Sequence, residues 1–82
     1  MAATSKKKLT EALTRRLRLR EPEFQLEKLG NKLSGNVISD TFLRVNDIDR
    51  QRLIWDALEE EFGDASREIV GVLLAYTQAE WN

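Results

Sequence analysis

The first twenty residues space their apolar side chains with the period of a helix. Four of them recur at three- and four-residue intervals and therefore share one face: Leu9, Ala12, Leu13 and Leu17. Pro22 disfavours helical geometry at the residue before it, so we expect this helix to end by about Arg20.

A β-hairpin is predicted directly after this helix. Phe24 and Leu26 alternate with polar residues, which is the period-2 pattern of a strand with one buried face. Residues 30–32, with the sequence Gly-Asn-Lys, supply turn chemistry, and residues 33–39 then form a second strand.

A second helix begins after Asn46, a favourable N-cap residue, and ends at Gly63, a natural C-terminal cap. Five apolar side chains share one face at about 100° per residue, and we expect this face to be buried. They are Ile48, Ile54, Trp55, Leu58 and Phe62. Gln51 points toward the same face, so we expect a partly buried amide that hydrogen-bonds to the backbone.

Residues 69–76 form an apolar and β-branched run that predicts a third strand. Thr77 and Glu80 then have the spacing of a capping box, and Tyr76 and Trp81 have the spacing of a hydrophobic staple. A short helical turn is therefore expected to close the chain.

The resulting order, α-β-β-α-β, predicts an α+β fold. We expect a two-layer sandwich in which helices cover one face of a three-stranded sheet. A chain of 82 residues has room for one domain, so residues 1–82 are expected to form a single unit. Residues 1–6 are expected to form a flexible basic tail.

Composition restricts the chemistry that this chain can perform. It has no cysteine and no histidine, which excludes disulfides, thiolate nucleophiles and the commonest metal ligand. The serines have no histidine to activate them, so we expect neither an enzyme nor a bound metal or cofactor. No apolar run approaches the roughly 18 residues of a membrane span, and we expect a cytoplasmic protein that does not bind membranes.

The net charge of −1 hides an asymmetry along the chain. Residues 1–20 hold seven basic and one acidic side chain, a net +6, whereas residues 21–82 carry a net −7. The basic opening predicts a phosphate-binding surface, together with arginines near the start of the second helix. The candidate nucleic-acid-binding residues are Lys6, Lys7, Lys8, Arg15, Arg16, Arg44, Arg50 and Arg52.

Two other interpretations of these charges stay open. The basic residues can belong to solvated helix faces and ion pairs, such as Arg52 with Asp56 at i,i+4. An opening that is rich in arginine and nearly free of acids also resembles an organellar transit peptide.

Several segments in this order and spacing resemble the BolA-like family. The family shows a strand that ends in Ser-x-x-Phe, an Arg-His-Arg segment, a Glu-rich helix end and a final Thr-Pro-Glu-Glu-Trp. The corresponding segments here are residues 37–42, 50–54, 57–61 and 77–81. The resemblance implies an α+β fold like that of class II KH domains. It also implies partnership with monothiol glutaredoxins through a shared [2Fe–2S] cluster.

The chain departs from the family where the cluster would be ligated. Gln51 stands in place of the histidine of Arg-His-Arg, and Ile69 in place of the second histidine. The hairpin loop, residues 30–35, has neither the His nor the Cys that the family uses there. Amide, hydroxyl and ammonium groups do not replace imidazole or thiolate as ligands of such iron. Arg44 replaces a common glycine.

The sequence favours the first of three functions and leaves the other two as alternatives. The first is a non-catalytic regulatory protein that binds nucleic acid weakly; the Gly-x-x-Gly clamp of KH domains is missing, since Gly30 and Gly35 are five residues apart. The second is an adaptor that docks a monothiol glutaredoxin through a surface around Leu53 and the last strand without ligating the cluster. The third is a relative that keeps the fold and has lost both activities.

Overall fold

The computed structural model describes residues 5–82, so residues 1–4 of the expected tail lie outside the described residues. Lys6 already belongs to the first helix, α1 (Lys6–Leu17), rather than to a tail. The Ser5 side chain caps this helix by accepting a hydrogen bond from the Lys8 backbone N–H at 3.1 Å. The helix ends about three residues earlier than Pro22 predicts, because Arg18 adopts a left-handed conformation with φ 51°.

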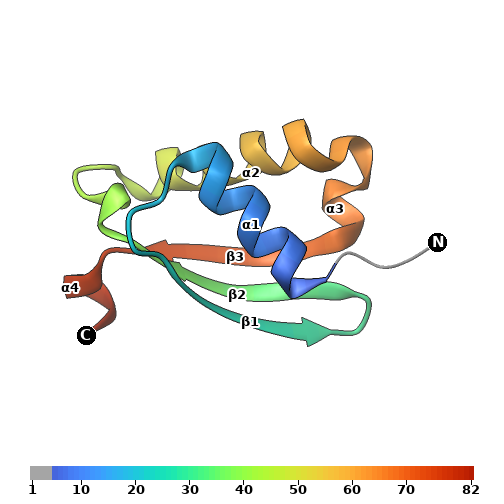
Figure 1. Cartoon of the computed structure of the whole chain (residues 1–82), viewed down its shortest axis with the longest axis horizontal. Helices are drawn as coiled ribbons and strands as arrows, with labels where there is room; N and C mark the ends of the chain where they lie inside the picture. The colour runs from blue at the N-terminus through green and yellow to red at the C-terminus, as the bar shows by residue number, and fades with distance from the viewer. Residues whose placement is uncertain (1–4) are drawn as a thin grey trace.

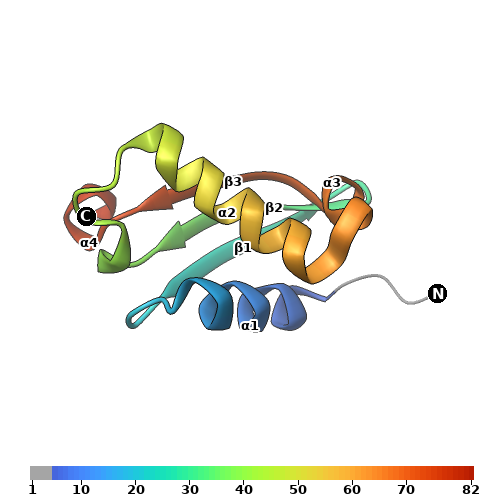
Figure 2. The same cartoon turned by 90° about the horizontal axis from the view of Figure 1, so that it is seen from above.

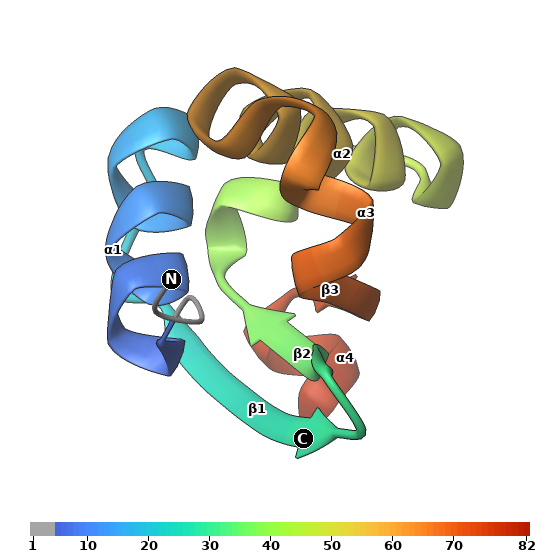
Figure 3. The ribbon, with the colours of Figure 1, turned by 90° about the vertical axis from the view of Figure 1, so that its right-hand side faces the viewer.

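Three strands form the sheet that α1 and α2 (Asp47–Phe62) cover on one side (Figures 1 and 3). The strands are β1 (Glu23–Leu29), β2 (Lys32–Ile38) and β3 (Val70–Tyr76). β1 and β2 pair antiparallel through a turn at residues 30–31, and β3 pairs parallel to β2 as an edge strand. The predicted α+β order is confirmed.

Short helical elements complete the chain, and only the last of them was expected from the sequence. They are the 3-10 turns η1 (Asp40–Phe42) and η2 (Gly63–Ala65) and the short helices α3 (Ser66–Ile69) and α4 (Gln78–Trp81). The capping box of Thr77 and Glu80 is confirmed in α4, and the Tyr76 and Trp81 rings lie 5.3 Å apart.

An irregularity in the pairing of β2 with β3 sets which β3 side chains reach the core. Leu33 pairs with Val70 but Gly35 pairs with Leu73, so β3 holds one extra residue. Both Val70 and Leu73 are therefore buried, whereas Leu74 points outward. A side chain at Gly35 would lie 1.9 Å from the Gln25 carbonyl oxygen, so only glycine fits there.

The core consists of side chains from the two long helices and the sheet. Seen from above, α2 crosses over the strands and α1 lies to one side (Figure 2). Leu9 and Leu13 come from α1, Ile54 and Leu58 come from α2, and Val37 comes from the sheet. Within residues 5–82 no helix is long and apolar enough to cross a membrane.

The buried face of α2 differs from the predicted one. Ile54 and Leu58 are buried as expected, but Trp55 and Phe62 are only partly buried and Ile48 is 72% exposed. The buried face is instead centred on Arg50, Ile54, Ala57 and Leu58. The helix is rotated relative to the prediction because a charged residue, Arg50, faces the interior.

This orientation predicts opposite outcomes for two aliphatic truncations on α2. Leu58→Ala should lower the free energy of unfolding by about 2–5 kcal/mol, because it opens a cavity among buried side chains. Ile48→Ala should change it by less than about 0.5 kcal/mol, because that side chain is exposed. Urea unfolding monitored by tryptophan fluorescence measures both. A larger loss for Ile48→Ala than for Leu58→Ala would contradict the observed orientation.

Candidate functional site

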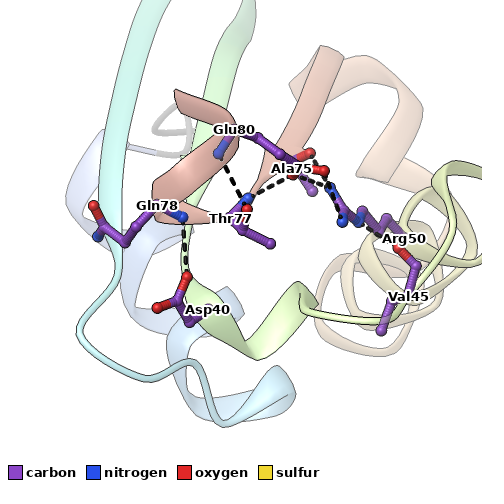
Figure 4. A network of polar contacts seen from close by, with 7 residues as sticks. All are labelled: Asp40, Val45, Arg50, Ala75, Thr77, Gln78 and Glu80. Atoms are coloured by element: carbon purple, nitrogen blue, oxygen red, sulfur yellow. Dashed lines mark hydrogen bonds and ion pairs between the residues drawn. The ribbon is translucent and has the colours of Figure 1, made fainter. Parts of the chain in front are cut away.

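Arg50 is buried, with 6% of its surface exposed, and its guanidinium joins three parts of the chain (Figure 4). Its Nε donates to the Val45 carbonyl at 2.7 Å. One terminal nitrogen donates to the Ala75 carbonyl at 3.1 Å and to a carboxylate oxygen of Glu80 at 2.6 Å. Because its hydrogen bonds are made inside the protein, Arg50 is not a surface contact for phosphate, contrary to the assignment from sequence.

Glu80 holds α4 against this guanidinium. Two hydrogen bonds lower the pKa of Glu80 to about 2. The bond from Arg50 has the larger effect, and the bond from the Thr77 backbone N–H, at 2.8 Å, has the smaller one. A second bond fixes the start of α4, because the Gln78 backbone N–H donates to Asp40 at 3.0 Å (Figure 4). The end of the chain is therefore attached to both α2 and η1.

Gln51 makes the hydrogen bond to backbone that the sequence predicts. Its amide nitrogen donates to the Leu73 carbonyl at 2.7 Å. With the Arg50–Ala75 bond, two successive side chains of α2 thus bind carbonyls on the free edge of β3. Covering such an edge removes acceptors that would otherwise pair with a strand from another chain.

A cleft of about 230 Å³ lies between the start of α2 and the free edge of β3, and we name it the α2–β3 cleft. It is lined by Asp47, Arg50, Gln51, Leu74, Ala75 and Tyr76. Leu74, in its lining, is 43% exposed, and the exposed Ile48 follows Asp47 on α2. The polar groups of Arg50 and Gln51 are already hydrogen-bonded, so what the cleft offers to a ligand is the apolar surface of Leu74 and Ala75 together with Asp47 and Tyr76.

Leu53, the docking residue expected from sequence, is 42% exposed but lies away from this cleft. It is two residues, or about 200° of helix rotation, from Gln51, whose side chain contacts β3. Leu53 and the last strand therefore do not share one surface. Sequence reasoning missed Leu74, because an all-apolar strand shows no alternation between buried and exposed positions.

The eight candidate basic residues are not brought together. Lys6, Lys7 and Lys8 form the exposed first turn of α1, which begins on the right in Figure 1, whereas α2 begins on the left. Arg44 and Arg52 are exposed near that start of α2. Arg52 lies 3.7 Å from Asp49, not near Asp56 as the i,i+4 spacing suggested.

Arg15 and Arg16 at the end of α1 are held by carboxylates at the end of α2. Both arginines bind Glu61, at 2.7 and 2.9 Å, and Arg16 also binds Glu60 at 2.9 Å. The hydrogen bond from Arg16, with the charge of Arg15, lowers the pKa of Glu61. These two cations serve to join the helices.

The place where the family would bind its cluster does not suit iron. Leu33 pairs with Val70, so the hairpin turn and Ile69 lie at the same end of the sheet. The side chains there, Asn31, Lys32 and Ile69, include no imidazole or thiolate. Within residues 5–82 no group of three or more Asp or Glu side chains could hold a metal ion either.

This two-layer arrangement is similar to solved structures of BolA proteins. A bolA protein homologue from Coxiella burnetii has a TM-score of 0.69 and 21% identity over 95% of this chain and 96% of its own. A bol-like protein from Babesia bovis has a TM-score of 0.69 and 22% identity over 98% and 92%. BolA1 from Arabidopsis thaliana has a TM-score of 0.66 and 20% identity over 90% and 92%.

No family model and no curated protein sequence matches this chain. The structural likeness nevertheless extends over nearly all of it. The chain therefore has the BolA fold, as its resemblance to that family implies.

The pairing of Glu80 with Arg50 predicts a stability difference that depends on pH. The pKa of Glu80 is lower in the folded protein than its ordinary value of 4.5, so its stabilising effect is complete above pH 4.5. It is lost as the pH falls from about 4.5 to about 2. Glu80→Gln should therefore have a lower Tm than wild type at pH 7, and the difference should shrink toward pH 2.

Thermal unfolding followed by circular dichroism at several pH values measures this difference. Glu59→Gln is the control, because Glu59 is an exposed acid of α2 that forms no ion pair within residues 5–82. A Tm difference for Glu80→Gln that stays constant from pH 7 to pH 2 would refute the proposed linkage.

Proposed function

We propose that this protein is a non-catalytic adaptor that docks a partner protein at the α2–β3 cleft. The observation that carries the proposal is the cleft itself, with Leu74 exposed in its lining, Ile48 exposed beside it, and Arg50 and Gln51 already hydrogen-bonded to β3. Apolar surface of this kind is stabilised by burial against another protein.

The chemistry of the cleft favours binding over catalysis. Its cation and its amide, on Arg50 and Gln51, are engaged with the backbone of β3. Imidazole is the side chain best suited to proton transfer near neutral pH, and the chain has no histidine.

The resemblance to the BolA-like family suggests the class of partner, a monothiol glutaredoxin. The chain has no imidazole or thiolate, so every protein ligand of a cluster in such a complex would come from the partner. The adaptor would then act by docking alone and would leave the visible circular dichroism of the partner's cluster unchanged.

Two leucines of nearly equal exposure give a matched test of the docking surface. Leu74→Asp should weaken binding of the monothiol glutaredoxin from the same organism by at least about tenfold, because it places a carboxylate in an apolar contact. Leu53→Asp, on the other flank of α2, should leave the affinity within about threefold of wild type. Isothermal titration calorimetry on folded variants measures both.

Each failure in this test has its own meaning. No binding by wild type at 100 μM, about the upper limit of useful calorimetric concentrations, would reject the glutaredoxin as partner. Loss of binding in Leu53→Asp, with Leu74→Asp unaffected, would move the docking surface to the other flank of α2.

Weak nucleic-acid binding is a second candidate, and one observation favours it. Lys6, Lys7 and Lys8 are exposed in the first turn of α1, where cations oppose the helix dipole and therefore gain nothing from the helix itself. A polyanion would interact favourably with them. The acids that engage Arg15 and Arg16 limit the size of this basic surface.

Salt dependence tests this second candidate. Fluorescence anisotropy with labelled duplex DNA should show micromolar or weaker affinity that falls as salt rises, with a slope of about −0.9 for each phosphate neutralised. Replacing Lys6, Lys7 and Lys8 together by Gln should flatten the slope. The absence of binding at low salt would reject the nucleic-acid candidate.

A further inference from the structure

The two edges of the sheet differ in how they are covered. The outer edge of β3 is occupied, because side chains of α2 donate to the carbonyls of Leu73 and Ala75. β1 forms the other edge and lies along the lower margin of the molecule in Figure 1. No other element of residues 5–82 hydrogen-bonds to its outer backbone groups. Such an edge presents a row of N–H and C=O groups that can pair with another strand.

The backbone groups on this outer edge belong to Phe24, Leu26 and Lys28. The Gln25 carbonyl points the other way, toward β2, because its oxygen occupies the space that a side chain at Gly35 would need. In an antiparallel ladder, successive residues direct these groups to opposite edges, so the residues on either side of Gln25 face outward. β1 pairs with β2 in an unbroken register, without a bulge or a proline that would interrupt pairing with a further strand.

The sequence of β1 suits antiparallel pairing with a second copy of itself in one register. When the pairing is centred on Leu26, Gln25 lies opposite Glu27 of the second copy and Phe24 lies opposite Lys28, so no like charges meet. When it is centred on Gln25, Glu23 lies opposite Glu27. When it is centred on Glu27, that residue lies opposite its own counterpart. Like charges directly opposite one another destabilise a strand pair, so the register centred on Leu26 is favoured.

The flank of α1 beside this edge is compatible with a second copy. Arg15 binds Glu61 and so marks the side of α1 that faces α2. Thr10, Thr14 and Leu17 lie about 100–160° around the helix from Arg15, and all three are partly buried and uncharged. Because α1 lies on the β1 side of the molecule (Figure 2), a second copy placed along β1 meets this uncharged flank.

We propose that β1 pairs with β1 of a second copy, in the register centred on Leu26, to form a two-fold symmetric dimer with one continuous sheet. The Gln25 amide of each copy then donates to Glu27 of the other copy, in place of its bond to Glu23 at 2.9 Å. The α2–β3 cleft of each copy lies at the opposite edge of the sheet and stays open. The dimer is therefore independent of the adaptor function.

Opposite charge changes at one exposed position test the pairing. Gln25→Lys places an ammonium opposite Glu27 of the second copy, and it should lower the Kd of the dimer by about 2- to 30-fold, since each dimer contains two such pairs. Gln25→Glu places a carboxylate there and should raise the Kd by a similar factor. Glu59→Gln and Arg52→Gln make the same two changes in net charge on the exposed side of α2, and they should leave the Kd within about twofold of wild type. Sedimentation equilibrium at low salt measures all five proteins.

Cross-linking tests the register, because the chain has no cysteine of its own. Side chains directly opposite one another on paired strands come close enough for a disulfide. An equimolar mixture of Gln25→Cys and Glu27→Cys in a glutathione redox buffer should therefore form the mixed dimer faster than a mixture of Glu23→Cys and Glu27→Cys. The second mixture is the control, since its cysteines oppose each other only in the register centred on Gln25. A tag on one variant of each mixture identifies the mixed dimer by non-reducing electrophoresis.

Three results would overturn the proposal. A wild-type chain that stays monomeric up to about 1 mM refutes the dimer and leaves the adaptor function untouched. A dimer whose Kd responds to Glu59→Gln and Arg52→Gln as strongly as to the Gln25 variants does not pair along β1. Faster cross-linking of Glu23→Cys with Glu27→Cys refutes the register centred on Leu26.

Discussion

A buried guanidinium organises this fold. A cation placed in the interior is strongly destabilising unless its nitrogens find acceptors. Arg50 meets that requirement with the Val45 carbonyl before α2, the Ala75 carbonyl on β3 and the carboxylate of Glu80 on α4. The position of α2 over β3 and the attachment of α4 therefore depend on the same side chain. The hydrogen bonds of Arg50 also fix the rotation of α2 about its axis, and this rotation leaves Ile48 exposed to solvent.

The neighbouring residue extends this constraint along the edge of the sheet. Gln51 binds the Leu73 carbonyl, two residues from the carbonyl that Arg50 binds. The outward carbonyls at these two positions of β3 are occupied, so addition of a strand from another chain is disfavoured there. What the edge presents instead is the side chain of Leu74, which favours recognition through apolar contact.

Part of the charge is used in ion pairs between segments of the chain. The positive end of the sequence and the acidic helix that follows meet where Arg15 and Arg16 bind Glu60 and Glu61. These pairs join α1 to α2 and reduce the basic surface that a polyanion would find.

Local interactions made much of the secondary structure predictable from the sequence. The Asn46 cap, the hairpin turn at residues 30–31 and the capping box of Thr77 each involve residues within four positions of one another. Their order was enough to predict an α+β sandwich, and the matching segments predicted its BolA fold.

Contacts between residues far apart in the sequence decided which side chains are buried or paired, and they also formed the candidate site. Arg50 and Glu80 are thirty residues apart, and Arg16 and Glu60 are forty-four apart, so no local pattern reveals either pair. The irregular register between β2 and β3, in which β3 has one extra residue, is a property of the paired strands. This register determines that Leu74 faces outward. The sequence determined which elements form, because their signals are local. Only the tertiary structure decided which side chains are buried, paired or left for a partner, because those outcomes depend on residues that folding brings together.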